Sequence, residues 1–202
     1  YNTLMQANEP AIVVECLNGY RVKERMPSNI GEFRVPLGKI EVTNTGSDIT
    51  LVTYGSTWRV VSDAVKNLES VGISCEVIDV QTLIPFDLNS EISVSLSKTN
   101  RLLIIGEDVP GGASSYILQK ILEDQRGYFH LDSSPRTLTA KAHRPPYGKD
   151  GDYFTKPSSE DVFELVYEIM NETVSMYNST DVQVNITPNH ISTVNDYSSI
   201  NM

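Results

Sequence analysis

The stretch DITLVTYGSTWRVVSDAVKNLESVGISCEVIDV, residues 48–80, decides the fold. It opens with an apolar, β-branched run that stops at Gly55, which is typical of a buried strand. Ser56 or Thr57 is then expected to cap a helix, and Gly72 to end it. The apolar face of that helix is predicted at Val60, Val61, Ala64, Val65, Leu68 and Val71. A second strand follows at once in ISCEVIDV, so the stretch predicts two parallel strands joined by a right-handed crossover.

The same alternation continues downstream. TLIPFD leads into a predicted short helix with Leu88, Ile92 and Leu96 on one side, and RLLIIGE, residues 101–107, is nearly all apolar like a strand covered on both faces. The next predicted helix buries Ile117, Leu118, Ile121 and Leu122, and RTLTAK, residues 136–141, predicts a strand nearer an edge. LGKIEV, residues 37–42, adds one more strand, whose direction the pattern does not give.

The last helix has the clearest start. Ser158 and Asp161 have the spacing of a capping box. An apolar stripe follows at Val162, Leu165, Val166, Ile169 and Met170. Strands that alternate with helices over such short connections predict an α/β domain with helices on both faces of the sheet.

Composition limits the partners. The 202 residues include 26 acidic and 16 basic ones, for a net charge of -10, so most of the surface would repel a polyanion and nucleic acid is not an expected partner. No apolar run is long enough to predict a membrane span. The two cysteines lie far apart in sequence, and Cys75 alternates with apolar residues like a small buried thiol. This usage indicates a reducing cytoplasm.

The two ends differ from the middle. The chain begins partway through a pattern of secondary structure. Leu4 and Met5 resemble the last turn of a helix, and AIVVE, residues 11–15, resembles a short buried strand. We therefore expect a fragment of a longer polypeptide. Residues 175–202 form a polar tail rich in Asn, Ser and Thr, in which the alternation of DVQVNIT suits either an edge strand or arm laid on a partner, or a mobile tail.

GEDVPGGASSYILQKIL, residues 106–122, invites a test for a phosphate-binding loop. Gly106 and Gly111 have the required spacing, but Gly112 and Ala113 stand where a P-loop needs lysine and a hydroxyl residue. The adjacent Glu107 and Asp108 would repel an anion, so no nucleotide site is predicted. We interpret the stretch as a tight strand-to-helix turn in which Ser114 or Ser115 caps the helix. The two carboxylates are candidates for acid–base chemistry at the end of a strand, or are ordinary loop residues.

Other catalytic patterns are missing from the sequence. The three histidines stand apart from any ligand at metal-binding spacing, and no GxSxG nucleophile motif occurs. We accordingly predict no catalytic, cofactor-binding or metal-binding residue. HRPPYGKDGDYF, residues 143–154, combines Arg144, Tyr147, Lys149 and Tyr153 with prolines, a composition that suits a rigid contact loop. A solvated loop is the alternative.

Five segments occur in an order that resembles a known family. They are MPSNIGEFRVPLGKIEV, DITLVTYGS, EVIDVQTLIPFD, KTNRLLIIGEDVPGG and KPSSEDVFELVYEIM. Together they resemble the C-terminal, transketolase-type domain of the β subunit of 2-oxoacid dehydrogenases, the decarboxylating component of the pyruvate and branched-chain complexes. The resemblance covers residues 9–173, and its most specific part is VTYGS followed by VIDVQTLIPFD.

The resemblance implies a fold and a set of boundaries. The fold is a three-layer α/β/α domain with a mixed, mostly parallel five-stranded sheet, in which LGKIEV is the antiparallel strand. Residues 1–37 would be the end of a pyrimidine-binding domain and its linker, residues 38–174 the transketolase C-terminal-like domain, and residues 175–202 the tail.

The resemblance also implies a role. Thiamine diphosphate and Mg would be bound by the full-length enzyme, between pyrimidine- and diphosphate-binding domains or an α subunit outside this chain, and none by this fragment. The domain would pair protomers into a homo-dimer and offer a surface to the dihydrolipoyl acyltransferase core. Interface candidates are Glu107, Asp108, Gly111, Gly112, Arg144, Tyr147 and Tyr153.

Two alternatives stay open. A transketolase or deoxyxylulose-phosphate synthase would contain the same domain. A non-enzymatic protein-binding module would instead use the HRPPYGKDGDYF loop and the edge of the sheet to hold a partner.

Overall fold

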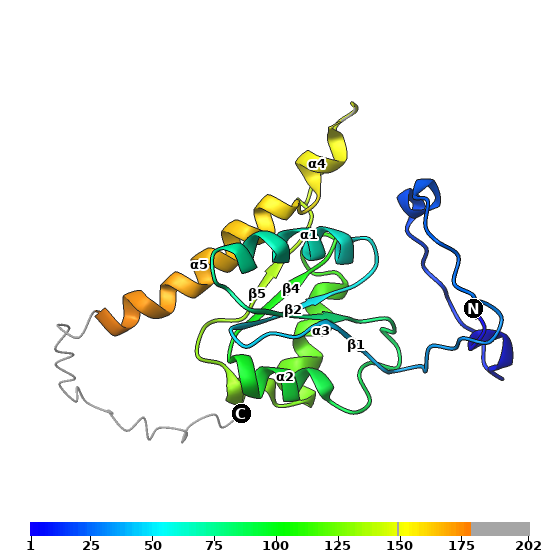
Figure 1. Ribbon diagram of the computed structural model, residues 1–202, viewed down its shortest axis with the longest axis horizontal. Coiled ribbons are helices and arrows are strands. Elements are labelled where there is room, and N and C mark those ends of the chain that lie inside the picture. Colours follow the sequence, from blue (N-terminus) through cyan, green and yellow to red (C-terminus); the bar gives the residue numbers. More distant parts are fainter. Residues whose placement is uncertain (149, 179–202) are drawn as a thin grey trace, which may run out of the picture.

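A mixed five-stranded sheet forms the centre of the molecule (Figure 1). The structure, a computed structural model, describes residues 1–148 and 150–178. The strands are β1 (Glu41–Asn44), β2 (Ile49–Thr53), β3 (Cys75–Asp79), β4 (Leu102–Ile105) and β5 (Arg136–Leu138), in the spatial order β1-β3-β2-β4-β5. β1 pairs antiparallel with β3, and the other pairs are parallel. The predicted mixed five-stranded sheet is confirmed. Its antiparallel strand lies further along the chain than predicted, because only the last two residues of LGKIEV, Glu41 and Val42, belong to β1.

Helices cover both faces of this sheet, as predicted. α1 (Thr57–Ser70) and α5 (Ser159–Asn178) pack on one face, while α2 (Glu91–Thr99) and α3 (Ala113–Gln119) lie on the other (Figure 1). A π-helical turn, Lys120–Asp124, prolongs α3, and the short α4 (Gly151–Thr155) stands between β5 and α5. Short 3-10 turns occupy Leu4–Gln6, Leu17–Arg21 and Gly127–His130.

Each face of the sheet has its own apolar core. Val61, Ala64, Val65 and Leu68 of α1 and Val162, Val166 and Ile169 of α5 are buried against one face. Ile92 and Leu96 of α2 and Ile117 and Ile121 are buried against the other. Since every residue of β2 and β4 is buried, these two strands form the middle of the domain, as their uninterrupted apolar runs predict.

One carboxylate is buried at the opposite end of the sheet from the strand-to-helix turns. Glu76 of β3 accepts hydrogen bonds from the ammonium group of Lys98 and, at 3.3 Å, from the backbone amide of Gly46. Burial acts to raise the pKa of Glu76, but hydrogen bonds from Lys98, Ser95 and Gly46 outweigh it and lower that pKa. The charged form of Glu76 is therefore part of the folded structure.

The starts of two helices test the predicted caps. The capping box of α5 is confirmed, because the Ser158 amide donates to Asp161 at 2.8 Å and the Asp161 amide donates to Ser158 Oγ at 3.2 Å. The cap predicted for α1 is wrong. Ser56 stands at the N-cap position but its side chain makes no cap hydrogen bond, and the Thr57 hydroxyl donates to the Tyr54 carbonyl at 2.7 Å.

Three local predictions fail. Val71, predicted on the apolar face of α1, is 52% exposed, because the helix ends at Ser70. AIVVE is irregular, and Ile12 is 94% exposed, because no strand within the described residues pairs with this segment. Leu88 precedes α2 and is 68% exposed, since the helix starts three residues later at Glu91.

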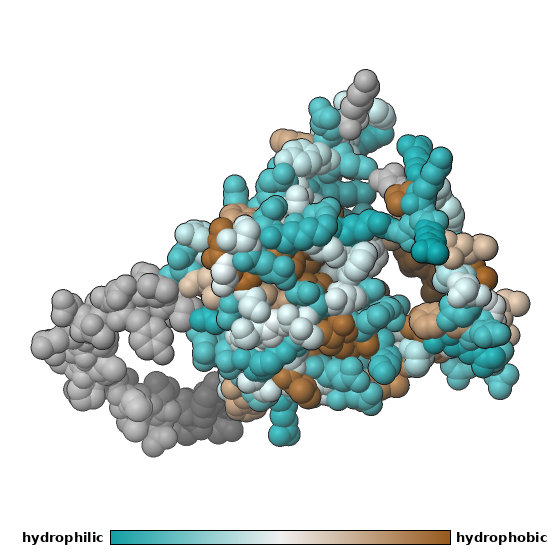
Figure 2. Space-filling model, in the orientation of Figure 1, coloured by the Kyte–Doolittle hydropathy of each residue, from teal (hydrophilic) through white to brown (hydrophobic). Residues whose placement is uncertain are grey.

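Residues 1–37 lie beside the domain (Figure 1). Wherever the structure describes the exposure of a residue in this segment, that residue is not buried. Hydrophobic residues, coloured brown, are visible on the segment in Figure 2. Glu24 pairs with Arg59 of α1, and this ion pair links the segment to the domain.

No helix in the described part of the chain is long and apolar enough to cross a membrane. The helix α5 extends to Asn178. The alternatives for DVQVNIT fall outside the described residues.

Candidate functional site

Polar side chains gather where β2 and β4 end, at the C-terminal edge of the sheet. Tyr54 follows β2 directly, and Gly106, Glu107 and Asp108 follow β4. The Tyr54 hydroxyl donates a hydrogen bond to Asp108 Oδ1. Burial, together with the hydrogen bond to Asp108 and the charges of Asp108 and Glu107, raises the pKa of Tyr54 far above its usual range. Tyr54 therefore stays a neutral donor at physiological pH.

The other oxygen of Asp108 holds the start of α3. Asp108 Oδ2 accepts hydrogen bonds from the Ser114 amide at 3.3 Å and from the Ser114 hydroxyl at 3.1 Å. The cap predicted at Ser114 or Ser115 is thus wrong, because the capping carboxylate comes from Asp108, six residues before. Gly112 is required here, since a Cβ at that position would lie 2.9 Å from the Cβ of Asp108.

This arrangement accounts for the missing phosphate site. Backbone amides at a helix N-terminus attract anions, and at α3 an internal carboxylate already takes that place. Gly111 has the positive φ of +92° that the tight turn needs.

Glu107 connects the same edge to a projecting segment. Its Oε2 accepts hydrogen bonds from the Ser56 hydroxyl at 2.7 Å and from the Lys156 ammonium at 3.0 Å. The Ala140 amide also donates to the Asp108 carbonyl at 2.9 Å. The two ends of the connection between β5 and α5 are thereby fixed to the Glu107-Asp108 turn. We call this connection, residues 139–148 and 150–156, the arm.

The remaining interface candidates lie on the arm, which projects away from the sheet (Figure 1). Tyr147 is 89% exposed and Tyr153 65% exposed. The Arg144 guanidinium stacks over the Tyr147 ring, with 5.3 Å between Cζ and the ring centroid, and donates to the Tyr147 hydroxyl at 2.7 Å. The structure therefore divides the seven candidates into two groups, four in the turn and three on the arm, with the arm rooted on the turn.

Both carboxylates at this edge take part in hydrogen bonds within the chain. The described residues contain no group of three or more His, Cys, Asp and Glu side chains placed to hold a metal ion. The Asp108 and Glu107 carboxylates accept hydrogen bonds from groups of the same chain. Their predicted contact with another subunit stays a prediction.

Sequence reasoning missed three members of this cluster: Tyr54, Ser56 and Lys156. A signal for the first two was present, because they follow a strand at the edge where parallel sheets collect functional side chains. Lys156 lies 49 residues from Glu107 in sequence, and nothing local points to their contact.

Comparisons with known proteins agree on one family. The family model described as "Transketolase, C-terminal domain" matches residues 38–162. A pyruvate dehydrogenase E1 component subunit beta from Acholeplasma laidlawii is 30% identical over 163 residues, which are 80% of this chain and 48% of that protein. The mitochondrial 2-oxoisovalerate dehydrogenase subunit beta of Dictyostelium discoideum is 35% identical over 133 residues, 64% of this chain and 34% of that protein.

Two further matches bear on function and fold. The beta subunit of an acetoin:2,6-dichlorophenolindophenol oxidoreductase from Bacillus subtilis is 28% identical over 168 residues, 83% of this chain and 48% of that protein. A solved split-gene transketolase, described as an inactive beta4 tetramer, aligns with a TM-score of 0.55 at 22% identity and covers 70% of this chain and 44% of that one. At that identity the structural match supports the fold alone. The chain spans about half the length of the curated relatives with which it aligns over most of its own length.

Proposed function

This chain belongs to the transketolase C-terminal domain family, and we propose that it is the C-terminal assembly domain of a thiamine-diphosphate-dependent 2-oxoacid dehydrogenase. The complete enzyme would decarboxylate a 2-oxoacid oxidatively and transfer the acyl group to lipoyl. In this proposal the domain holds subunits together and takes no part in the chemical step.

The observation that carries the proposal is the set of relatives. Proteins named as beta subunits of pyruvate and 2-oxoisovalerate dehydrogenases match this chain across the family domain. The geometry agrees with an assembly role. The polar groups at the C-terminal edge of the sheet bind one another and fix the arm, whose aromatic and cationic side chains are exposed.

The cofactor is assigned to other parts of the enzyme. Thiamine diphosphate would need a site for its diphosphate and for Mg²⁺. The residues at the candidate edge do not fit a diphosphate, because the carboxylate of Asp108 occupies the amide at the start of α3. We therefore propose that pyrimidine- and diphosphate-binding domains, or a separate α subunit, hold the cofactor.

The boundaries and partners are part of the same proposal. Residues 1–37 would end the pyrimidine-binding domain, which is supported by the exposure of large apolar side chains such as Ile12, Val14 and Phe33. Residues 38–174 would form the assembly domain and residues 175–202 a tail. The partners would be a second copy in a homo-dimer, the α subunit and the dihydrolipoyl acyltransferase core, in the cytoplasm, a location supported by the buried free thiol of Cys75.

The alternative is a transketolase, because such an enzyme would contain the same family domain. We rank it second because proteins named as dehydrogenase and oxidoreductase beta subunits align with 80% or more of this chain.

The test uses the complete protein and a substrate panel. With thiamine diphosphate and Mg²⁺ it is expected to decarboxylate pyruvate or 2-oxoisovalerate, and not to transfer two-carbon units from ketose phosphates. Two-carbon transfer without 2-oxoacid turnover would support the transketolase alternative, and no turnover of either class would support a binding module. Calorimetry on the 202-residue chain is expected to detect no thiamine diphosphate binding. Micromolar binding would contradict the assignment of the cofactor to other domains.

A further inference from the structure

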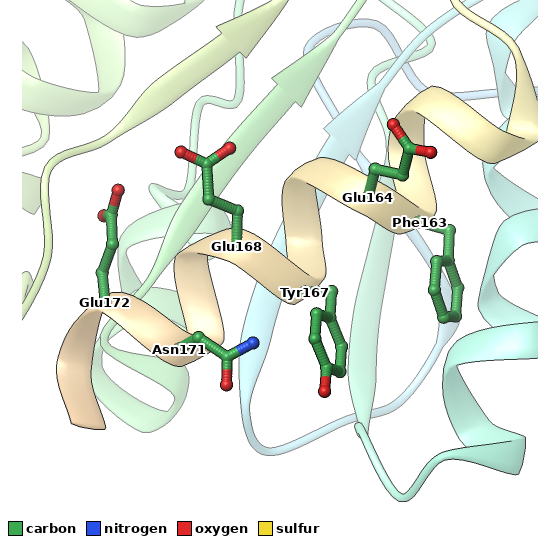
Figure 3. A pocket seen from close by; sticks show the side chains of 6 residues that line it. All are labelled: Phe163, Glu164, Tyr167, Glu168, Asn171 and Glu172. Carbon is green, nitrogen blue, oxygen red and sulfur yellow. The ribbon is translucent and has the colours of Figure 1, made fainter. Parts of the chain in front are cut away.

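A groove of about 370 Å³ lies between the connection that leads into α2 and the end of α3. Residues 85–88 and Ser90 line one side, and Tyr116, Lys120, Asp124 and Gln125 line the other. We call these residues the α2–α3 groove. Its size lies at the lower end of the range for small-molecule sites, roughly 300–1,000 Å³. The larger hollow on α5 is different, because all the residues that line it come from one helix and cannot face a ligand from two sides (Figure 3).

The two sides of the groove supply an aromatic and apolar lining. The Phe86 and Tyr116 rings meet edge to face at 78°, with their centroids 6.2 Å apart. Both rings are partly buried against the core beneath the groove. Leu88 is 68% exposed, and Pro85 belongs to the same lining. An apolar side chain that entered the groove would therefore exchange contact with water for contact with apolar surface, which is favourable.

One cation and one anion face the groove as a pair. Lys120 Nζ donates to Asp124 Oδ2 at 2.6 Å and lies 5.7 Å from the centroid of the Tyr116 ring. The hydrogen bond to Asp124 raises the pKa of Lys120, so this ammonium group is charged at physiological pH. An ammonium group has three donors and a carboxylate has two acceptor oxygens, so their mutual bond leaves each with further capacity. Both side chains are partly exposed.

Gln125 adds a hydrogen-bond acceptor that lacks a donor. Its Nε2 donates to Asp87 Oδ2 at 2.9 Å, which keeps Oε1 from facing that carboxylate. Asp87 also accepts from the amides of Glu91 and Ile92, so it holds the start of α2. Gln125 Oε1 is buried, and no group in the part of the chain that the structure describes donates to it. Buried polar atoms nearly always have a partner, so we expect a bound molecule to supply the donor.

A π-helical turn brings these groups to one side. It covers Lys120–Asp124 and includes the hydrogen bond from the Gln125 amide to the Lys120 carbonyl, at 3.0 Å. A π-helical turn bonds residues five apart, so Gln125 returns to the side of Lys120. An α-helix, with about 3.6 residues per turn, would direct Gln125 away from it. Single π-helical turns are rare and are frequent at functional sites.

We infer that the α2–α3 groove binds an α-amino acid with an apolar side chain. The ligand carboxylate would accept from Lys120, and the ligand ammonium would donate to Asp124 and to Gln125 Oε1. The ligand side chain would lie on the aromatic lining. Charge complementarity selects a zwitterion, because an amine alone would be repelled by Lys120 and a carboxylate alone by Asp124 and Asp87. The inference does not depend on the proposed function, since it uses groups of this chain alone.

Ligand titrations test the site. L-leucine would be added to the nitrogen-labelled 202-residue chain while its amide signals are followed by NMR. Two analogues separate the charges of the ligand, since isocaproate lacks the ammonium group of leucine and isoamylamine lacks its carboxylate. Leucine should shift the amide signals around Gln125 in a saturable way. Each analogue should bind on the order of tenfold more weakly, as expected for one lost ion pair.

Substitutions assign the contacts to residues. Lys120→Gln should weaken leucine binding on the order of tenfold without weakening that of isoamylamine. Asp124→Asn should weaken leucine binding by a similar factor without weakening that of isocaproate. Gln125→Met removes the acceptor oxygen and should also weaken leucine binding. Lys66→Gln is the matched control, because Lys66 forms the same kind of exposed pair with Asp63 on α1 and should leave leucine binding unchanged.

The outcomes leave the proposed function untouched. Circular dichroism first establishes that every variant folds. The amino-acid site is overturned if leucine gives no saturable shift up to millimolar concentrations, or if isocaproate and isoamylamine bind as tightly as leucine. It is equally overturned if Lys120→Gln and Asp124→Asn bind leucine like the wild-type chain. Each of these results would still leave the assembly role to be decided by turnover of the complete protein.

Discussion

The clearest structural prediction concerns Asp108, whose carboxylate joins the ends of β2 and β4 to the start of α3. Asp108→Ala removes the hydrogen bond from Tyr54 together with the two from Ser114. A hydrogen bond to a charged group contributes roughly 1.5–3 kcal/mol, and loss of a helix cap costs about 1 kcal/mol. Because Tyr54 is only partly buried, we take the lower end for its hydrogen bond and expect a total loss of about 2.5 kcal/mol in the free energy of unfolding.

The assay is a double-mutant cycle with Tyr54→Phe. Urea unfolding can be followed by the fluorescence of Trp58, the single tryptophan of the chain. Tyr54→Phe alone should cost about 1–2 kcal/mol, and the pair should cost less than the sum by a similar amount, because the same hydrogen bond is removed in both. Asp63→Ala is the control, since its ion pair with Lys66 is exposed and should leave the unfolding midpoint unchanged. A loss below about 1 kcal/mol for Asp108→Ala, or strict additivity with Tyr54→Phe, would refute the reasoning.

The same cycle has a signature in pH. Because the pKa of Tyr54 is raised in the folded state, its contribution to stability is complete below the ordinary tyrosine pKa, about 10, and decreases as the pH rises above that value. The wild-type chain should therefore lose stability in this alkaline range more steeply than Tyr54→Phe. Equal slopes for the two proteins would show that the phenol is not held neutral by burial and Asp108.

Three further predictions follow from buried groups. Burial and the facing Glu41 raise the pKa of Asp79 to about 6, so this carboxylate costs stability as the pH rises from about 4 to about 6. Asp79→Asn should therefore be about 1–2 kcal/mol more stable than wild type at pH 7, after discounting for partial exposure, and equal to it near pH 3.5, whereas a less stable variant at pH 7 would contradict the assignment. Glu76→Gln should cost about 1–3 kcal/mol at pH 7, because it weakens the partly buried hydrogen bond from Lys98 to Glu76. A cost that persists unchanged at low pH would argue against a charged Glu76. Burial and nearby carboxylates raise the pKa of Cys75 to about 12, so a thiol reagent should label Cys75 only after unfolding. Labelling of Cys75 itself in the folded chain, with Cys16 replaced by serine, would contradict its burial.

The main strands and helices could be predicted from the spacing of their apolar residues, because each buried face stays buried along the whole element. The continuous apolar runs in β2 and β4 match strands covered on both faces, and the stripe of Val162, Val166 and Ile169 matches a helix packed on one side. AIVVE has an equally strong strand pattern. The strand prediction for AIVVE failed because a strand also needs a neighbouring strand to complete its backbone hydrogen bonds. The sequence of AIVVE alone does not indicate whether such a neighbour exists.

The candidate site could be predicted only in part. Glu107 and Asp108 stand out because they follow a strand at the edge where α/β sheets place polar groups. Their partners Tyr54, Ser56 and Lys156 come from other elements, 49 or more residues away in sequence, so the contacts depend on the order of strands in the sheet. The caps of α1 and α3 were assigned to the nearest hydroxyl residues for the same reason. In α3 the better acceptor, a carboxylate, came from the preceding turn.

The claim that this domain assembles the enzyme without catalysing the reaction is tested most directly by measuring 2-oxoacid turnover in two samples side by side. The 202-residue chain and the complete protein would each be incubated with thiamine diphosphate, Mg²⁺ and a 2-oxoacid, and the native mass measured in the same solutions. We predict that the chain self-associates without turnover and that the complete protein decarboxylates the 2-oxoacid as an assembled oligomer. Decarboxylation by the chain alone would contradict the claim that this domain assembles the enzyme and leaves the chemistry to its partners.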